Sequence, residues 1–213
     1  KEILPFLQED KDAIITIDFE TKGDVDLIKN ELQGLLEQIP DFRDQLFRFN
    51  DDRWENHTNN WPTIAEMRSA MQRVLILVDH SQVASNEMGV YHKYDITVEN
   101  HWQGSLDSCS PRFVSYPNYP WSTPYITGFD RSWPRLFTMN HFCCSTGIES
   151  LHRVNTNRIG GGDNGWGVLY PRTMLCVAES KMERKPNFIV VDWTDIGDVL
   201  EVVDYLNFGG RLG

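Results

Sequence analysis

The chain has 213 residues, with 20 Lys and Arg against 31 Asp and Glu, a formal net charge of -11 at pH 7. This length is enough for one domain with a sizeable core, and the acidity argues against a groove that follows nucleic-acid phosphates. The longest apolar runs, as in 74–78, reach five residues, too short to cross a bilayer.

Four short apolar runs rich in β-branched residues predict buried strands near residues 13–20, 73–79, 136–141 and 187–193. Each run ends on a polar or charged residue, which is typical of parallel strands whose carboxyl ends open onto a site. A weaker run from Tyr94 to Val98 alternates between apolar and polar residues and predicts an accessory strand.

Amphipathic helices are predicted between and after these strands. The first presents apolar residues at helical spacing: Ile28, Leu32, Leu35, Leu36 and Ile39. Residues 63–66 form a capping-box pattern, and the last helix, over residues 196–206, stops before Gly209. Strand followed by helix, repeated, predicts an α/β protein with a parallel sheet. The strands are too few for a closed barrel, so a small open sheet and a barrel that lacks a part both remain open.

The four cysteines are Cys109, Cys143, Cys144 and Cys176, and no CxxC spacing occurs, which argues against a zinc ribbon or a thioredoxin-like motif. An even number of cysteines together with a glycosylation sequon at Asn56 favours an oxidising compartment. We therefore expect a secreted glycoprotein, and the start at Lys1 instead of Met is expected of a processed polypeptide. The alternative is a cytosolic protein with four buried thiols.

Six segments in order resemble the secreted phospholipase C-like phosphodiesterases, which carry a phosphatidylinositol-specific phospholipase C X-like domain. The matching residues are the WPTIAEM of 61–67 with the RVLILVD of 73–79, the YDITVE of 94–99, Cys109 with Arg112, the FTMNHF of 137–142, the KPNFIVVDW of 185–193 after Cys176, and residues 197–207. The resemblance spans residues 61–207.

This resemblance implies a TIM-like barrel and a disulfide between Cys109 and Cys176. The run at 13–20 looks like the fourth strand of the family, so residues 1–213 are expected to form the C-terminal part of a single barrel. The family keeps its two catalytic histidines near its first and third strands, which have no counterpart here. We therefore expect a second polypeptide that carries the N-terminal half, with Cys143 or Cys144 as candidates for a link to it.

Two carboxylates of the first strand, Asp18 and Glu20, share one face because side chains alternate along a strand. Glu20 resembles the strand-end carboxylate that binds calcium in metal-dependent relatives, so the pair predicts a Ca²⁺ or Mg²⁺ site. The alternative is a polar pair hydrogen-bonded to neighbouring loops.

The other strands end in Asp79, in Asn140 with His141, and in Asp192, and we expect these residues to line one substrate-binding mouth with the first pair. By alternation only one of Asn140 and His141 can face that mouth. Carboxylates gathered this closely need a compensating cation, and the candidate is Arg112, because it resembles the arginine that follows the matching cysteine in the family. We assign no catalytic residue within the chain.

The function implied is a phosphodiesterase that cleaves a phosphoinositide-like or other lipid phosphodiester by acid–base catalysis, active once the missing part supplies the histidines. The alternative is a noncatalytic secreted protein that uses the barrel for binding or structure, because a fold does not fix a function. A hydrolase with a Ser or Cys nucleophile is disfavoured, since the chain has no GxSxG elbow.

Overall fold

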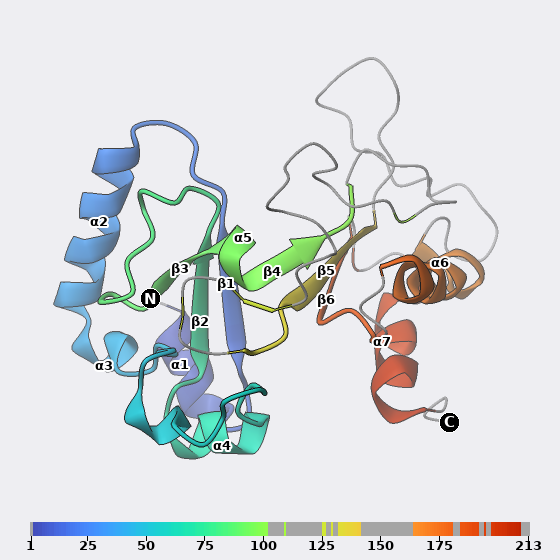
Figure 1. Cartoon of the computed structure of the whole chain (residues 1–213), viewed down its shortest axis with the longest axis horizontal. Helices are drawn as coiled ribbons and strands as arrows, with labels where there is room; N and C mark the ends of the chain where they lie inside the picture. The colour runs from blue at the N-terminus through green and yellow to red at the C-terminus, as the bar shows by residue number, and fades with distance from the viewer. Residues whose placement is uncertain are drawn as a thin grey trace. The chain divides into compact units, whose positions relative to one another are not determined.

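The structure is a computed structural model, and it describes residues 2–101, 109, 125–126, 129, 132–141, 164–180, 184–191, 194 and 197–209. The chain divides into two compact units (Figure 1). The first comprises Lys1–Ile96 with Tyr125–Arg135, and the second comprises Thr97–Pro124 with Leu136–Gly213. Each unit contains a three-stranded sheet.

The first unit holds, in chain order, α1 (Ile3–Glu9), β1 (Ile15–Phe19), α2 (Val25–Gln38), α3 (Pro40–Arg43), a 3-10 turn (Asp52–Trp54), α4 (Ile64–Ser69), β2 (Val74–Val78), β3 (Val90–His92) and α5 (Lys93–Ile96). Its strands are parallel in the order β1-β2-β3, with Ile15 opposite Val74 and Ile76 opposite Val90. The predicted parallel strands at 13–20 and 73–79 are confirmed.

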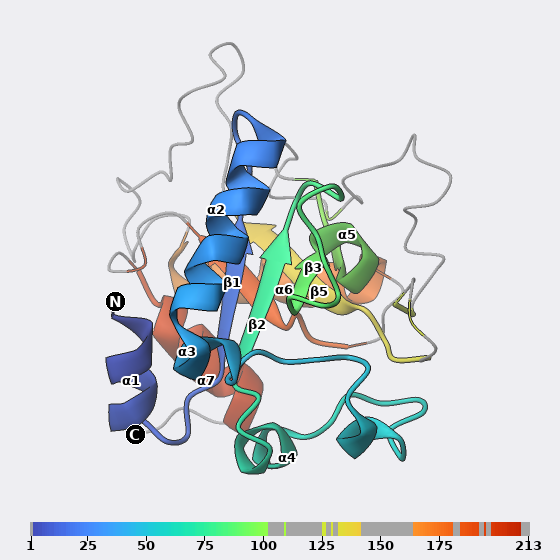
Figure 2. The same cartoon turned by 90° about the vertical axis from the view of Figure 1, so that its left-hand side faces the viewer.

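One face of this sheet packs against helices. Val74, Ile76 and Val78 lie in one apolar core with Leu7 of α1 and Leu36 of α2, and Figure 2 shows α2 lying over β1 and β2. All five residues of β2 are buried, so the alternate residues, such as Leu77, are buried on the opposite face as well. The continuous apolar run of β2 therefore reflects a strand that is covered on both faces.

Local signals set the helix ends. The side chain of Asp24 accepts hydrogen bonds from the first-turn amides of α2, as an N-cap does. The capping box at Thr63 and Glu66 is confirmed, with reciprocal bonds of 3.2 and 2.7 Å. Leu35 of α2 departs from the expected apolar face, because this side chain is exposed whereas Leu36 packs in the core.

Arg73, immediately before β2, ties α1 to the sheet. Its buried guanidinium donates to the carbonyls of Leu7 at 2.9 Å and Asp10 at 3.0 Å, and to the side chain of Gln45 at 3.1 Å. These acceptors include carbonyls at the end of α1, which have no partner within the helix. A buried arginine thus acts here as a structural clamp.

The second unit holds β4 (Thr97–Glu99), β5 (Leu136–His141), α6 (Trp166–Glu179), β6 (Phe188–Val191) and α7 (Val199–Phe208). These strands are parallel in the order β4-β5-β6, with Thr97 opposite Leu136 and Thr138 opposite Phe188. The predicted strands at 136–141 and 187–193 are confirmed as far as they are described. β6 is less deeply buried than its apolar sequence predicts, and Val190 is 40% exposed.

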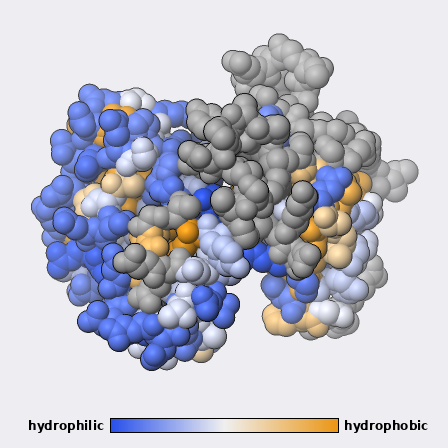
Figure 3. Space-filling model, in the orientation of Figure 1, coloured by the Kyte–Doolittle hydropathy of each residue, from blue (hydrophilic) through white to orange (hydrophobic). Residues whose placement is uncertain are grey.

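The core of the second unit joins Val98, Phe137 and Met139 of the sheet to Leu169 of α6 and Val202 of α7. α7 stops at Gly209, whose φ of 73° suits a glycine C-cap, as the sequence predicts. The outer side of α7 is apolar, since Leu200 and Phe208 are 74% and 72% exposed, and Figure 3 shows hydrophobic surface over this helix.

The loop before α7 is held to the start of α6. Asp198 accepts from the amide of Trp166 at 2.7 Å and donates its own amide to the carbonyl of Asn164 at 3.0 Å. Gly197 has a φ of +89°, and a Cβ there would lie 2.7 Å from backbone atoms of Asn164. This close approach requires glycine.

The expected accessory strand over Tyr94–Val98 is wrong in its first part. Residues Lys93–Ile96 form α5, and β4 begins at Thr97. His92 pairs with Asp95 at 3.2 Å, and the guanidinium of Arg135 donates to the carbonyl of Tyr94. These contacts hold a helical turn that an alternating pattern alone does not reveal.

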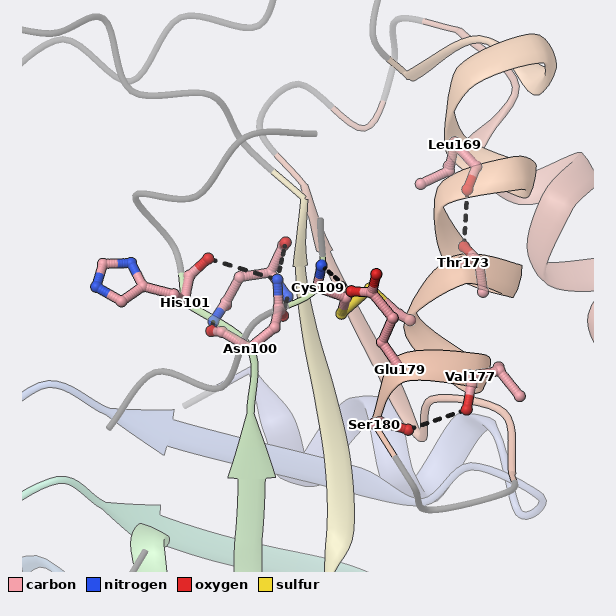
Figure 4. The surroundings of a disulfide bond; sticks show 10 residues. Asn100, His101, Cys109, Leu169, Thr173, Val177, Glu179 and Ser180 are labelled. Atoms are coloured by element: carbon pink, nitrogen blue, oxygen red, sulfur yellow. Dashed lines mark hydrogen bonds between the residues drawn. A yellow bond between two sulfur atoms is a disulfide. The ribbon is translucent and has the colours of Figure 1, made fainter. Parts of the chain in front are cut away.

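The disulfide between Cys109 and Cys176, implied by the family resemblance, is confirmed. Both cysteines belong to the apolar core of the second unit. The amide of Cys109 also donates to the carboxylate of Glu179 at 2.6 Å, so Cys109 is fixed to α6 at two points (Figure 4). Of the helices that the structure describes, none has both the length and the apolar character needed to cross a membrane.

Candidate functional site

The carboxyl ends of β1, β2 and β3 carry charged residues on the sheet face opposite α1 and α2. Because Ile15, Ile17 and the core residues of β2 face the helices, alternation places Asp18 on the other face. Asp79 directly follows β2, and Lys93 directly follows β3. The first unit thus forms a polar edge from these three residues at the end where parallel sheets place their sites.

Asp18 and Lys93 form an ion pair across this edge. The Oδ2 of Asp18 lies 2.6 Å from the Nζ of Lys93, and the two side chains are 38% and 11% exposed. The lysine ammonium is therefore largely withdrawn from water and neutralises a carboxylate of the opposite edge strand. Sequence reasoning missed Lys93, whose one signal was its position just before the run at Tyr94–Val98.

Asp79 is held by the loop after β1. The backbone amide and the hydroxyl of Thr21 donate to its Oδ1 at 2.8 and 2.5 Å. Burial is the largest single influence on the Asp79 pKa and raises it, but the bonds from Thr21 and the charge of Lys93 outweigh it and hold the pKa below its usual value. Asp79 therefore remains a carboxylate at neutral pH.

Glu20, the second predicted metal ligand, lies in solvent beside Lys22 at 3.3 Å, with side chains 72% and 86% exposed. Nowhere in the described residues do three or more His, Cys, Asp or Glu side chains gather as a metal site requires. Since Lys93 and Lys22 already pair with the two carboxylates, this donor set does not fit the six to eight oxygens that Ca²⁺ takes. The metal site stays a prediction, and no chemical step below depends on it.

In the second unit a buried amide network lies at the ends of β4 and β5. Asn140 Nδ2 donates to the Oε2 of Glu99 at 2.9 Å and to the carbonyl of Asn100 at 3.0 Å. Asn100 in turn accepts from the amide of Asn140 at 2.6 Å and donates to its carbonyl at 3.0 Å. Glu99 and Asn100 were not among the predicted site residues. Their signal was the polar ending of β4.

Asn140 and His141 lie on opposite faces of β5, as expected from alternation. Phe137 and Met139 face the helices, so Asn140 lies on the other face with Glu99. His141 lies on the side of β5 that faces the helices, and it is completely buried. Its role in substrate binding stays a prediction.

The remaining predicted positions are spread along the chain. Arg112 and Asp192 lie outside the described residues. Asn56 is exposed in a turn, as a glycosylated residue must be. Asp18, Glu20 and Asp79 lie at one sheet, and Asn140 lies at the other. That all five predicted strand-end residues share one mouth stays a prediction.

Two further histidines lie near the polar edge of the first unit. His92 is the last residue of β3 and lies opposite Val78, a residue that faces the helices. His92 therefore also lies on the helix-facing side of the sheet, and it pairs with Asp95. The buried Nδ1 of His80 has no hydrogen-bond partner. Among the described strand residues, His92 and His141 therefore each lie on the helix-facing side of their own sheet, and neither shares a face with Asp18 or Asn140.

The chain matches one known family over nearly its whole length. A family model of the PI-PLC X domain, described as PI-PLC X 1, matches residues 1–207. This match extends the resemblance seen in residues 61–207 to the N-terminal sixty residues and their first strand. No curated protein and no solved structure matches the chain. The chain belongs to the PI-PLC X family.

Proposed function

We propose that this chain is part of a secreted phospholipase C-like phosphodiesterase that cleaves a phosphoinositide-like phosphodiester. In this proposal it forms the C-terminal part of a TIM-like barrel, and a second polypeptide supplies the N-terminal strands with the catalytic histidines. The observation that carries the proposal is the polar edge, formed by Asp18, Asp79 and Lys93 in a member of the PI-PLC X family.

The polar edge suits the hydroxyl-bearing part of such a substrate. It offers two carboxylates as acceptors and one ammonium as donor, a mixture that binds neighbouring hydroxyl groups. Two negative charges against one positive charge do not favour the phosphate itself at this point. We therefore assign the polyol headgroup to Asp18, Asp79 and Lys93, and the phosphate to groups elsewhere, with Arg112 as the candidate.

The reaction needs a base and an acid. The base removes the proton from the attacking hydroxyl, either of water or of the substrate, as its oxygen bonds to phosphorus. The bond from phosphorus to the leaving oxygen breaks, and the acid gives that oxygen a proton. The described residues of this chain bind and orient the substrate in this scheme, while the histidines of the second polypeptide transfer the protons.

The edge strand β1 supports a partner. β1 has β2 on one side and no strand on the other among the strands that the structure describes. An open edge presents unpaired backbone groups that favour the addition of another strand. A preceding strand of the family's barrel is the natural occupant.

The test is cleavage of phosphatidylinositol and of glycerophosphoinositol, followed by phosphorus NMR, with protein purified together with any bound polypeptide. We expect turnover, and we expect Asp79→Asn and Lys93→Met to lower kcat/KM by at least about tenfold through lost substrate binding. Glu31→Gln, an exposed carboxylate change on α2, is the control. A preparation that contains the second polypeptide and binds the headgroup but never cleaves it would overturn the enzymatic proposal.

A noncatalytic secreted binding protein is the second candidate. It is favoured by the closed pairing of the polar groups, since Lys93 neutralises Asp18 and Asn140 satisfies Glu99. Paired groups of this kind also occur at purely structural positions. Binding of inositol phosphates without turnover, lost in Lys93→Met, would identify this function.

A further inference from the structure

The sheet of the second unit has one edge strand that is only partly covered. β6 has β5 on one side and no strand on the other among the strands that the structure describes. None of the residues of β6 is as deeply buried as the residues of β4, the other edge strand of this sheet, which are all buried. Yet β6 is as apolar as β2, a strand that is covered throughout. β6 therefore has the composition of a covered strand at an open edge.

The open side of β6 includes one of its faces as well as its edge. Ile189 and Val191 pack against the apolar core that α6 and α7 share. Alternation puts Phe188 and Val190 on the face away from these helices, and Val190 is one of the exposed large apolar residues of the chain. An extended segment that lies beside β6 covers both the backbone groups of the edge and this apolar face.

Arg184 carries an unpaired charge close to the start of this strand. It shortly precedes Asn187, whose amide donates to the carbonyl of Phe137 at 2.8 Å and whose side-chain oxygen accepts from the amide of Phe137 at 2.9 Å. The guanidinium nitrogens Nε and Nη2 of Arg184 are buried and have no hydrogen-bond partner. Burial lowers the pKa of Arg184, but a guanidinium stays charged at neutral pH.

Other cations of the chain show how such a charge is normally satisfied. The ammonium of Lys185, next to Arg184, donates to the carbonyl of Leu206 near the end of α7. In the first unit, the buried guanidinium of Arg73 donates to three acceptors. A buried charge that lacks both acceptors and a counter-ion destabilises a fold. Arg184 therefore calls for an anionic group that its own unit does not supply.

We propose that an extended segment of the second polypeptide covers β6 and places an acidic side chain against Arg184. This inference rests on the proposed function, which requires that polypeptide, and it adds a docking surface on the second unit and the charge of the segment that docks there. Arginine and carboxylate pair through two parallel hydrogen bonds. This pair fixes the register of the segment, which apolar contacts along β6 specify less sharply. A free anion satisfies Arg184 alone and leaves Val190 uncovered.

The test is zero-length cross-linking of Arg184→Lys in the protein purified together with its bound polypeptide. A carbodiimide joins lysine amines directly to carboxylates and does not couple arginine, so wild-type protein, which keeps the neighbouring Lys185, is the matched control. We expect the introduced lysine to be linked to an Asp or Glu of the second polypeptide, in a peptide pair that is absent from the wild type.

A second measurement follows the affinity of the complex. Arg184→Met should raise the dissociation constant for the second polypeptide by about tenfold or more, as the loss of one partner of a buried charge pair does. Arg43→Met, an exposed change on α3, is the control and should leave it unchanged. Circular dichroism of each variant first checks that the fold is kept, so that lost association is not lost folding.

Two results overturn the inference while the proposed function stands. One is that, with the second polypeptide present, the introduced lysine is linked to its own chain, to another copy of it, or to nothing. The other is that Arg184→Met binds the second polypeptide as tightly as Arg43→Met. A protein that never carries a second polypeptide refutes both the docking surface and the two-chain form of the proposed function.

Discussion

The ammonium of Lys93 reaches across the middle strand of its sheet to Asp18. The two groups lie 2.6 Å apart, although β2 separates the strands that carry them. A largely buried lysine thereby links the two edge strands on the polar face. Its structural role follows from this pairing.

This link predicts a measurable coupling. In a double-mutant cycle on the free energy of unfolding, Asp18→Asn and Lys93→Met should show an interaction of about 0.5–3 kcal/mol, as contacting charged residues do. The matched control is Glu20 with Lys22, an exposed pair expected to couple by roughly 0–1 kcal/mol. Urea unfolding measures both cycles, and equal coupling in the two pairs would contradict the prediction.

The contribution of Asp79 to the stability of the fold is predicted to be lost in acid. Its folded-state pKa lies below the ordinary value of 3.8, so its contribution is present above that value and is lost as pH falls toward the lower folded pKa. The stability difference between wild type and Asp79→Asn should therefore be largest near neutral pH and shrink below pH 3.8. Thr21→Val, which removes the hydroxyl donor, should reduce the effect. A difference independent of pH would count against it.

Replacing Arg73 is predicted to lower the free energy of unfolding strongly. Arg73→Met removes three hydrogen bonds and leaves the buried carbonyl of Leu7 and the carbonyl of Asp10 without this donor. We expect a loss of about 2–4 kcal/mol in the free energy of unfolding. Arg43→Met, an exposed change on α3, should cost less than about 0.5 kcal/mol. Similar losses in the two variants would show that Arg73 does not act as a clamp.

The disulfide is predicted to stabilise the folded protein by restricting the unfolded chain. Cys109 and Cys176 are separated by 67 residues, so the double variant Cys109→Ala/Cys176→Ala should lose about 2–5 kcal/mol. Peptide mapping under non-reducing conditions should recover the two cysteines in one linked pair. Finding both as free thiols in the native protein would refute the pairing.

The partner proposal predicts a second mass in native mass spectrometry of the protein isolated from its source. The edge of β1 that has no neighbour among the described strands makes an added strand favourable. Mild denaturation should release a chain whose sequence carries the missing histidines. A monodisperse monomer of 24.7 kDa that melts cooperatively would refute it and would favour the noncatalytic function.

Short-range patterns determined much of this protein from its sequence. The continuous β-branched apolar run of β2 favours a buried strand, Thr63 and Glu66 form a capping box with each other, and Gly209 ends α7 through its own backbone freedom. Each of these signals acts within a few residues, so the chain alone specifies the result. The motifs that resemble the PI-PLC X family are of the same local kind.

Strand register and tertiary contact decided the rest. Thr21 and Asp79 are 58 residues apart, and they meet because β1 and β2 align in parallel. Lys93 could not be assigned to Asp18 from the sequence, because the two residues belong to the ends of different strands, which meet only through their pairing with β2. Alternation puts Asn140 and His141 on opposite faces of β5, but only the packing of Phe137 and Met139 against the helices decided that Asn140 lies on the face away from them. Local propensity carries no information on which distant group a side chain meets, whereas the packed sheet does.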